Sequence, residues 1–262
     1  MDNVVNVTVS IVAYNTSLEI LSKCVDSIRD RNIVWNGIFI DHSPDSRYKS
    51  LFENREQWQY FMRGHINDGF GGGNNFAMSQ AKKSDYILLV NPDLYLEENS
   101  ISDMLTFARS KPNLGIFTGK ITYPNGSLQR LNKKNPTVFG LMGRRFPFLQ
   151  KISIITKAVK EYEMSDMNYE SEMDIEFISG CWMLIPYHVW YEVKGFDPRF
   201  FLYFEDADLT RRIKNLGYRT LYAPSARAIH EYQRGSHKSF KLFILFIRSM
   251  IQYFTKWGWQ WK

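Results

Sequence analysis

An acidic cluster behind an aromatic run is the first feature of this sequence that could do chemistry. Glu205, Asp206 and Asp208 follow residues 200–204, four of which are aromatic, and open a predicted helix. A carboxylate in aromatic surroundings has a raised pKa and can take a proton from an attacking hydroxyl. The structural alternative is that these acids offset the helix dipole and that Asp208 pairs with Arg211 or Arg212, three and four residues later.

Two further groups have the residue types of an anion or metal site. Asn91 and Asp93 follow a buried apolar run, and an aspartate there could hold a divalent cation through oxygen, although Asn, Pro and Asp also make ordinary turns. His230 ends a strand-like segment; a lone histidine is more often structural, but imidazole is acceptable to Mn²⁺. Arg234 and Ser236 behind it would suit phosphate oxygens.

A glycine-rich segment, residues 67–75, is predicted to be a loop that leads into a helix ending near Lys83. Its glycines would let backbone approach a ligand, and a helix N-terminus favours anions. The segment is not a Walker A motif, because no Gly-Lys-Ser/Thr follows. It is not a dinucleotide fingerprint either, because it follows the third strand signal rather than the first.

The elements that must position these groups alternate between strand and helix. Strands are predicted at residues 7–14, 37–40, 60–62 and 86–90, with helices between them at 18–28 and up to 83. This alternation predicts an α/β fold with a mostly parallel central sheet flanked by helices. Ligands bind outside the carboxyl ends of such strands, so Asp41, residues 67–75 and residues 91–93 should share one site.

The second half has weaker signals. Further elements are expected as helices at 100–109, 187–194 and from 205, and as extended segments at 114–118, 177–186, 218–223 and 226–230. Residues 123–175 are predicted to form an irregular excursion that contacts an acceptor.

The C-terminal residues form an amphipathic, tryptophan-rich segment. Apolar side chains from Phe240 to Phe254 recur at helical spacing, and Trp257, Trp259 and Trp261 alternate behind them. One interpretation is a helix packed on the main domain or on a second subunit in a homodimer. The other is a helix seated peripherally on the inner face of the cytoplasmic membrane, where tryptophan and lysine are favoured.

Composition narrows the class of protein. The chain has 262 residues, 44% of them hydrophobic, a net charge of +6 and a sequence pI near 9.1, as expected of a folded protein with an anionic partner. Two cysteines without CxxC spacing favour a reducing, cytoplasmic setting. We expect no signal peptide and no membrane span. The sequence has neither a clustered basic face nor an RNP-like motif, so it does not indicate nucleic-acid binding.

Six segments together resemble family 2 glycosyltransferases, and within them the bacterial rhamnosyltransferase branch of O-antigen and surface polysaccharide synthesis. The resemblance covers roughly residues 5–240. The segments are VSIVAYN (9–15), NDGFGGGNN (67–75), NPD (91–93), GCWML (180–184), GFDPRFFLYFEDADL (195–209) and AIH (228–230).

The resemblance implies a GT-A (Rossmann-like) fold and inverting transfer from a nucleotide sugar. Residues 1–120 would form the nucleotide-sugar half, 121–239 the acceptor and base half, and 240–262 an appended tail. The donor would be dTDP-rhamnose, or alternatively UDP-galactofuranose or a UDP-hexose. The acceptor would be a hydroxyl of a growing glycan or of a polyprenyl-diphosphate-linked sugar.

The resemblance also implies residue roles. Asp206 would be the catalytic base with Glu205 beside it, and Asp93 and His230 would hold Mn²⁺ or Mg²⁺. Asn91 stands where many members have a first aspartate, which removes one charge from the metal site. The substrate-binding set would be Ala13, Tyr14, Asn15, Asp41, Asn67, Gly69, Phe70, Gly71, Gly73, Asn74, Asn91, Trp182, Arg211, Arg234 and Ser236.

Two other classes compete with this hypothesis. A nucleotidyltransferase or a nucleotide-dependent oxidoreductase could use a similar sheet, but a first-strand GxGxxG is missing. A non-catalytic carbohydrate-binding module would suit the aromatic content, but most aromatic residues fall within apolar patterns that predict core.

Overall fold

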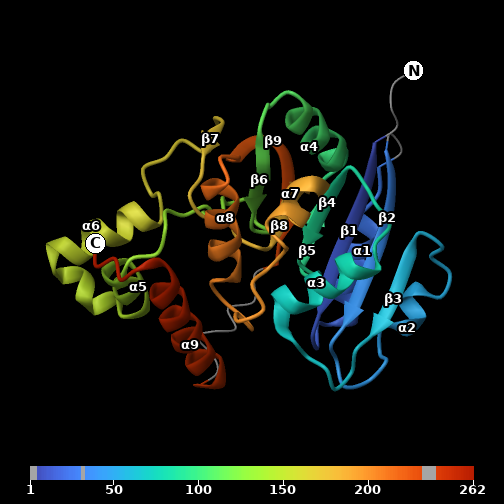
Figure 1. The fold of residues 1–262 in the computed structure, drawn as a ribbon, viewed down its shortest axis with the longest axis horizontal. Coiled ribbons are helices and arrows are strands. Elements are labelled where there is room, and N and C mark those ends of the chain that lie inside the picture. Colours follow the sequence, from blue (N-terminus) through green and yellow to red (C-terminus); the bar gives the residue numbers. More distant parts are fainter. Residues whose placement is uncertain (1–4, 31–32, 232–239) are drawn as a thin grey trace.

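A mixed β-sheet is the framework of the computed structural model, which describes residues 5–30, 33–231 and 240–262. The strand order is β3-β2-β1-β4-β8-β6-β9-β5, and β7 pairs with β9 outside this path. Figure 1 shows the sheet flanked by helices, with α5 and α6 set apart from it on one side. The predicted α/β class is confirmed.

The strands are β1 (Asn6–Ala13), β2 (Val34–Asp41), β3 (Trp58–Met62), β4 (Tyr86–Val90), β5 (Leu94–Leu96), β6 (Leu114–Thr122), β7 (Met173–Asp174), β8 (Trp182–Pro186) and β9 (Arg219–His230). The helices are α1 (Leu18–Ser27), α2 (Lys49–Phe52), α3 (Gly69–Gln80), α4 (Ser100–Arg109), α5 (Val138–Arg145), the 3₁₀ helix η1 (Pro147–Lys151), α6 (Ser153–Tyr162), α7 (Tyr187–Glu192), α8 (Glu205–Asn215) and α9 (Phe240–Trp257).

The parallel arrangement that the sequence predicts holds for β3, β2, β1 and β4. Beyond β4 the sheet is mixed. There β6 pairs parallel with β9, whereas β8 pairs antiparallel with both β4 and β6, and β5 and β7 pair antiparallel with β9. In the parallel half, Ala13 is in register with Asp41, so the carboxyl ends of β1 and β2 meet at one edge.

Side chains along each strand point alternately to the two faces of the sheet, and both faces are buried. In β4, Leu88 and Val90 pack in a cluster with α1 and α4, whereas Ile87 and Leu89 pack in a cluster with α3, α7 and α8. Successive strand side chains point to opposite faces, so a continuous apolar run is what a strand buried on both faces requires. The result is a three-layer domain.

Two local predictions were wrong, and two predicted extended segments are one strand. Residues 69–75 are the start of α3 rather than a loop, and residues 123–175 contain α5, η1 and α6 rather than an irregular excursion. The two extended segments 218–223 and 226–230 lie in one long strand, β9, whose pairing with β6 shifts register twice. Tertiary packing overrides the weak helix propensity of glycine in α3.

The C-terminal helix packs one face on this domain. Tyr253 and Phe254 are buried in a third cluster with Phe200, Phe204 and residues of α5 and α6. The Ser249 hydroxyl donates to the Leu202 carbonyl (2.7 Å). The Val138 N–H donates to the Gln260 carbonyl (2.8 Å), so the residues after α9 pair with the start of α5.

Candidate functional site

Hydrogen bonds connect the segments that follow β1 and β2 at their carboxyl ends. The Asp41 carboxylate is fully buried and accepts from the Tyr60 hydroxyl (2.7 Å) and the Ser43 N–H (2.8 Å). The Ser43 hydroxyl in turn accepts from the N–H of Asn15, which has a left-handed backbone (φ 53°). Asp41 therefore holds the shape of the strand ends, and each of its oxygens keeps a further lone pair.

A pocket of about 450 Å³ opens at these strand ends. Tyr14 stands exposed on its rim. The other lining residues come from β1, the turns after β2 and β3, the start of α3, the aromatic run before α8, and α9: Val12, Ala13, His42, Asn67, Gly69, Phe70, Phe201, Leu202, Lys241, Leu242 and Leu245. The sequence motifs had indicated the pocket residues from β1 and α3. Nothing in those motifs indicated that α9 forms a wall of the pocket.

The glycines of α3 serve close packing against protein. A Cβ on Gly69 would lie 1.8 Å from the Phe201 carbonyl oxygen, and one on Gly73 would lie 2.7 Å from Val12. A Cβ on Gly71 would lie 3.0 Å from Phe196. These contacts bring the helix start against β1 and the segment before α8, so that Phe70 and Gly69 reach the pocket.

The neighbouring asparagines are committed to the fold. Asn74 is buried, accepts from the Ser10 hydroxyl (2.7 Å) and donates to the Phe70 carbonyl (3.0 Å). Asn75 clamps both backbone groups of Phe196 (2.8 and 2.9 Å). Asn67 accepts from the Gly69 N–H (3.0 Å) and lines the pocket.

Asp93 and His230 meet directly. Because Leu94 of β5 is in register with His230 of β9, the imidazole Nε2 lies 3.2 Å from Oδ1 of Asp93. The other ring nitrogen, Nδ1, lies 3.0 Å from Oε1 of buried Gln129, whose amide donates to the His230 carbonyl (2.6 Å). Sequence reasoning missed Gln129, which lies in a segment without periodic signal.

Asp93 and His230 fit a divalent cation whose remaining coordination positions are filled by a bound ligand. Gln129 Oε1 accepts from the Nδ1–H tautomer, which leaves the Nε2 lone pair free, as the hydrogen-bond partners of metal-bound histidines do. Among the described residues no three His, Cys, Asp or Glu side chains gather into a metal site. Asp93 and His230 alone would leave coordination positions for phosphate oxygens and water.

Asp206 lies at the N-terminus of α8 with its carboxylate fixed by backbone. Oδ2 accepts from the Gly180 N–H (2.9 Å) and Oδ1 from the Ala207 N–H (2.9 Å). Burial nevertheless raises the pKa of Asp206 to about 6. Burial and the neighbouring Asp206 charge raise the pKa of Glu205 well above its usual range, and Glu205 Oε2 has no hydrogen-bond partner among the described residues.

The backbone before α8 is strained. Tyr203 and Phe204, two aromatic residues in succession, have left-handed conformations (φ 70° and 66°). Such conformations cost roughly 1–3 kcal/mol each and persist where the surroundings fix them, often at functional sites. Here Phe204 is held by rings of Phe246 and Tyr253 from α9.

Residues 180 and 181 link the region around Asp93 to the region around Asp206. The Asn91 N–H donates to the Cys181 carbonyl (2.8 Å), and Gly180 beside it donates to Asp206. Burial, reinforced by the charges of Asp93 and Asp206, raises the pKa of the Cys181 thiol to about 12. A Cβ on Gly180 would lie 2.9 Å from Phe70, which connects Asp206 to the pocket.

The structure places the remaining candidates away from the pocket or outside the described residues. Trp182 has no exposed surface and packs in the core cluster that contains residues of α1 and α4. Arg211 faces α9, with its guanidinium 3.3 Å from the Tyr253 hydroxyl and 4.5 Å from the Trp257 ring centroid. Arg234 and Ser236 lie outside the described residues.

Known proteins resemble this chain over much of its length. Residues 56–249 match the model of the family described as glycosyltransferase like family 2. The rhamnosyltransferase WbbL of Escherichia coli (strain K12) is 26% identical over 197 residues, which cover 72% of this chain and 70% of that protein. The N-acetylglucosaminyl-diphospho-decaprenol L-rhamnosyltransferase of Mycobacterium tuberculosis (strain CDC 1551 / Oshkosh) is 29% identical over 148 residues, covering 56% of this chain and 47% of that protein.

A solved structure shares the fold. GalNAc-T7 with UDP, GalNAc and Mn²⁺ superposes with a TM-score of 0.68 at 14% identity, covering 89% of this chain and 44% of that one. The chain thus spans about half the length of the mycobacterial relative and of this structural neighbour. The GT-A fold that the motifs implied is confirmed.

Proposed function

The chain belongs to the glycosyltransferase-like family 2, and from this membership we propose that it moves a sugar from a nucleoside diphosphate to a hydroxyl with inversion, using Asp206 as the base. The observation that carries the proposal is the Asp206 carboxylate, which two backbone N–H groups fix beside Gly180, a residue that also packs against Phe70 of the strand-end pocket. Geometry and a pKa raised to about 6 both suit a general base at neutral pH.

Transfer needs a proton acceptor on the side opposite the leaving group. A sugar hydroxyl is a weak nucleophile, so its O–H proton passes to a free lone pair of Asp206 as the oxygen attacks the anomeric carbon. The bond from that carbon to the diphosphate breaks in the same displacement, which gives inversion without a covalent intermediate. Glu205, whose burial favours its neutral form, adds little charge beside Asp206.

The donor would lie across the pocket at the ends of β1 and β2. Ala13, Tyr14 and Asn15 would border its nucleoside together with Asp41, while Asn67, Gly69 and Phe70 would border the sugar diphosphate. Gly71, Gly73 and Asn74 would shape this wall from behind, through their packing on β1 and the segment before α8. Asp93 and His230, with Asn91 nearby, would hold Mn²⁺ or Mg²⁺, which supplies positive charge to the departing diphosphate.

Rhamnose from dTDP-rhamnose is the proposed sugar and donor. Both curated relatives carry rhamnosyltransferase names, and the name of the mycobacterial one describes a diphospho-decaprenol acceptor. We accordingly propose a polyprenyl-diphosphate-linked sugar or a growing surface polysaccharide, such as an O-antigen, as the acceptor. Such an acceptor would bring the enzyme to the cytoplasmic face of the membrane.

A panel of nucleotide sugars tests the donor. We expect dTDP-rhamnose to raise the Tm more than UDP-galactofuranose, UDP-hexoses or GDP sugars, and Mn²⁺ or Mg²⁺ to increase the shift. Preference for one of the other donors would remove the rhamnosyl assignment and keep the transferase. The absence of stabilisation by every nucleotide sugar, with and without metal, would contradict a donor site at this pocket.

A further inference from the structure

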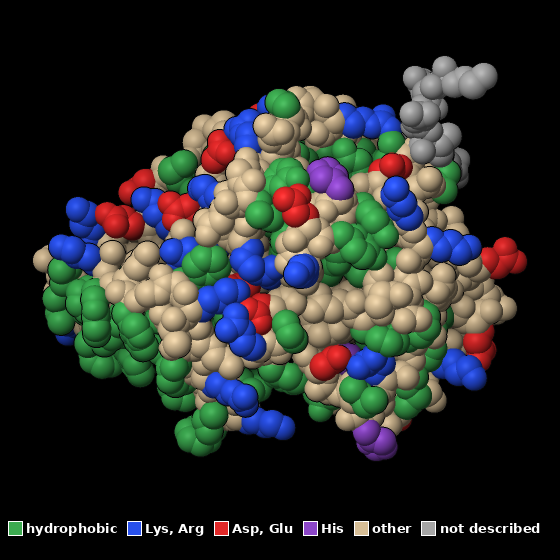
Figure 2. All heavy atoms as spheres, in the orientation of Figure 1, with side chains coloured by type: hydrophobic (Ala, Val, Ile, Leu, Met, Phe, Trp, Pro, Cys, Tyr) green, Lys and Arg blue, Asp and Glu red, His purple; other side chains and the backbone are tan. Residues whose placement is uncertain are grey.

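Exposed apolar side chains concentrate in two segments that are far apart in the sequence. Of the eighteen large hydrophobic residues that are exposed within the described ranges, ten belong to residues 142–154 and 240–261. They are Met142, Phe146, Phe148, Ile152, Ile154, Phe240, Ile244, Ile251, Trp259 and Trp261. Figure 2 shows hydrophobic side chains massed over α5, η1 and α6.

The first segment turns apolar groups outward at the bend between α5 and α6. Phe148 in η1 is 67% exposed, and its ring centroid lies 6.1 Å from that of Phe146. Leu141, Ile155 and Val159 face inward and bury the opposite side of the same helices. The outward residues are therefore an additional apolar surface that the core of this unit does not require.

The second segment continues that surface. Phe240, Ile244, Ile247 and Ile251 recur every three or four residues and form one stripe along α9. Phe243 is the next side chain around the helix, and the Arg145 guanidinium lies 4.9 Å from its ring centroid and 5.8 Å from that of Phe146. The stripe and the α5–α6 bend thus meet at Arg145 and form one apolar surface.

Positive charge is concentrated around this surface. Residues 138–162 and 240–262 together contain nine Lys and Arg and one acid, Glu161. Two of the nine are paired with acids outside these segments, Arg144 with Glu163 and Lys256 with Asp197 and Asp208. The rest of the chain has 24 basic and 26 acidic residues, from totals of 33 and 27, so the net charge of the protein comes from these two segments. Lys151, Lys241 and Arg248 are exposed beside the apolar groups.

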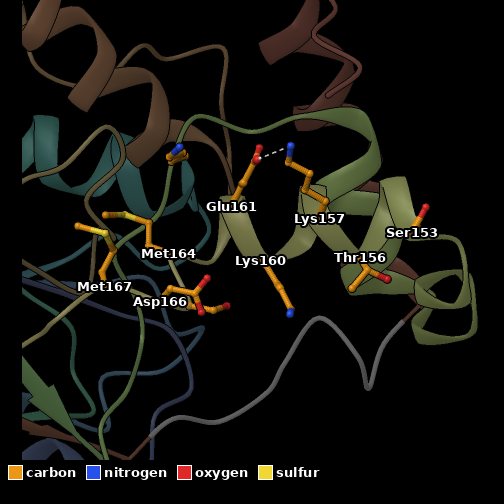
Figure 3. Close-up of a pocket in the computed structure, with 10 residues that line it drawn as sticks. Ser153, Thr156, Lys157, Lys160, Glu161, Met164, Asp166 and Met167 are labelled. Atoms are coloured by element: carbon orange, nitrogen blue, oxygen red, sulfur yellow. Dashed lines mark ion pairs between the residues drawn. The ribbon is translucent and has the colours of Figure 1, made fainter.

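The lysines of α6 extend the basic rim to a hollow of about 660 Å³ between α6 and residues 164–167. Figure 3 shows Lys157 turned toward Glu161, 3.8 Å away, while Lys160 extends in a different direction from the helix. Lys134 lines the same hollow. Three lysines and two acids, Glu161 and Asp166, line the hollow, so its charge balance is one positive charge.

We propose that this surface, made of the α5–α6 bend and the outer stripe of α9, seats the protein on a bilayer that contains anionic lipid. Large apolar groups enter the interface between acyl chains and head groups, and lysine and arginine pair with the lipid phosphates. A second copy of the chain is the less suitable occupant, because a two-fold contact would set one basic rim against another.

The inference deepens the proposed function, since a lipid-linked acceptor requires the enzyme at a membrane. It also connects the membrane to the donor site. Lys241, Leu242 and Leu245 line the pocket from the same helix whose stripe faces outward. A protein held by α9 would thus keep this pocket wall in place and its opening close to the lipid surface.

Co-sedimentation with vesicles tests the surface without donor, acceptor or metal, so that its failure is separate from any failure of the transferase assignment. Phosphatidylcholine vesicles with and without phosphatidylglycerol would be compared for the wild type and the Phe148→Ser/Ile152→Ser double variant. Val34→Ser/Leu216→Ser, which changes two exposed apolar residues elsewhere, is the matched control. A Tm within a few degrees of the wild type would exclude misfolding.

We expect the wild type and the control to bind the anionic vesicles, and the Phe148→Ser/Ile152→Ser variant to bind about tenfold less. Lys151→Gln should lower binding about fivefold, and added salt should lower it for every protein. Equal binding of the two double variants would overturn the proposal. So would a wild type that ignores vesicles and forms a dimer that Phe148→Ser/Ile152→Ser disrupts.

Discussion

The imidazole Nε2 of His230 lies 3.2 Å from Oδ1 of Asp93, although 137 positions separate the two residues in the chain. The antiparallel pairing of β5 with β9 brings them together, and Gln129 fixes the ring from its other side. The proposed cation site thus depends on β5, a strand too short to be recognised from the hydrophobic periodicity of the sequence.

Gln129 should control metal affinity rather than chemistry. In Gln129→Ala the ring loses its acceptor at Nδ1, so the half-saturating Mn²⁺ concentration for transfer should rise about tenfold, while excess Mn²⁺ restores kcat. Gln80→Ala, at an exposed position on α3, is the control. An unchanged metal titration in Gln129→Ala would argue that the Asp93–His230 pair holds no cation.

The pH profile should report the base. Burial raises the pKa of Asp206 to about 6, and a base acts only when deprotonated, so kcat/KM should rise with pH and level off above about 6. The profile would be measured from pH 5 to 8 at saturating metal. A flat profile over that range would exclude a carboxyl with this pKa from the rate-determining proton transfer.

Glu205 should make the folded state less stable as pH rises. Its pKa is higher in the folded than in the unfolded chain, so the folded state binds the proton more tightly. Stability is then largest below the unfolded pKa and falls as pH rises toward the folded one. Glu205→Gln cannot ionise, so its Tm should fall less between pH 4 and 8 than that of the wild type. Glu53→Gln, at an exposed position, should behave as the wild type does.

The sequence predicted the parallel half of the sheet well, because β1, β2 and β4 are apolar runs ended by polar turns. Residues 69–75 were predicted as a loop because glycine disfavours helix. Their contacts with Val12, Phe196 and Phe201 come from elements distant in the sequence, and those contacts decide the conformation.

Gly69 offers a direct test of that packing. Gly69 and Gly126 share φ of +80°, but a Cβ would strike the Phe201 carbonyl at Gly69 and meet nothing within 4 Å at Gly126. The strain of a left-handed alanine is common to both variants and cancels. Gly69→Ala should therefore cost about 1–3 kcal/mol more in denaturant unfolding than Gly126→Ala. Equal losses would mean that α3 does not pack as the structure describes.

The site was predictable only in part. Asp206 and Asp93 stand in local motifs, so their positions at a helix start and a strand end could be anticipated. Local sequence patterns could not indicate that α9 would place Tyr253 and Trp257 against the Arg211 guanidinium. Likewise, a lone buried Gln129 has no pattern, and its role arises from side-chain contacts with His230, 101 positions away in the chain.

Acceptor-dependent release of nucleoside diphosphate by the wild type and by Asp206→Asn tests the central claim most directly. The substitution keeps the size of the side chain and removes its basicity, and donor-induced stabilisation would show that the pocket is intact. We predict that the wild type releases nucleotide when acceptor is added and that Asp206→Asn is slower by about 10²–10⁴-fold. Asp206→Asn turning over at the wild-type rate would contradict the assignment of Asp206 as the base.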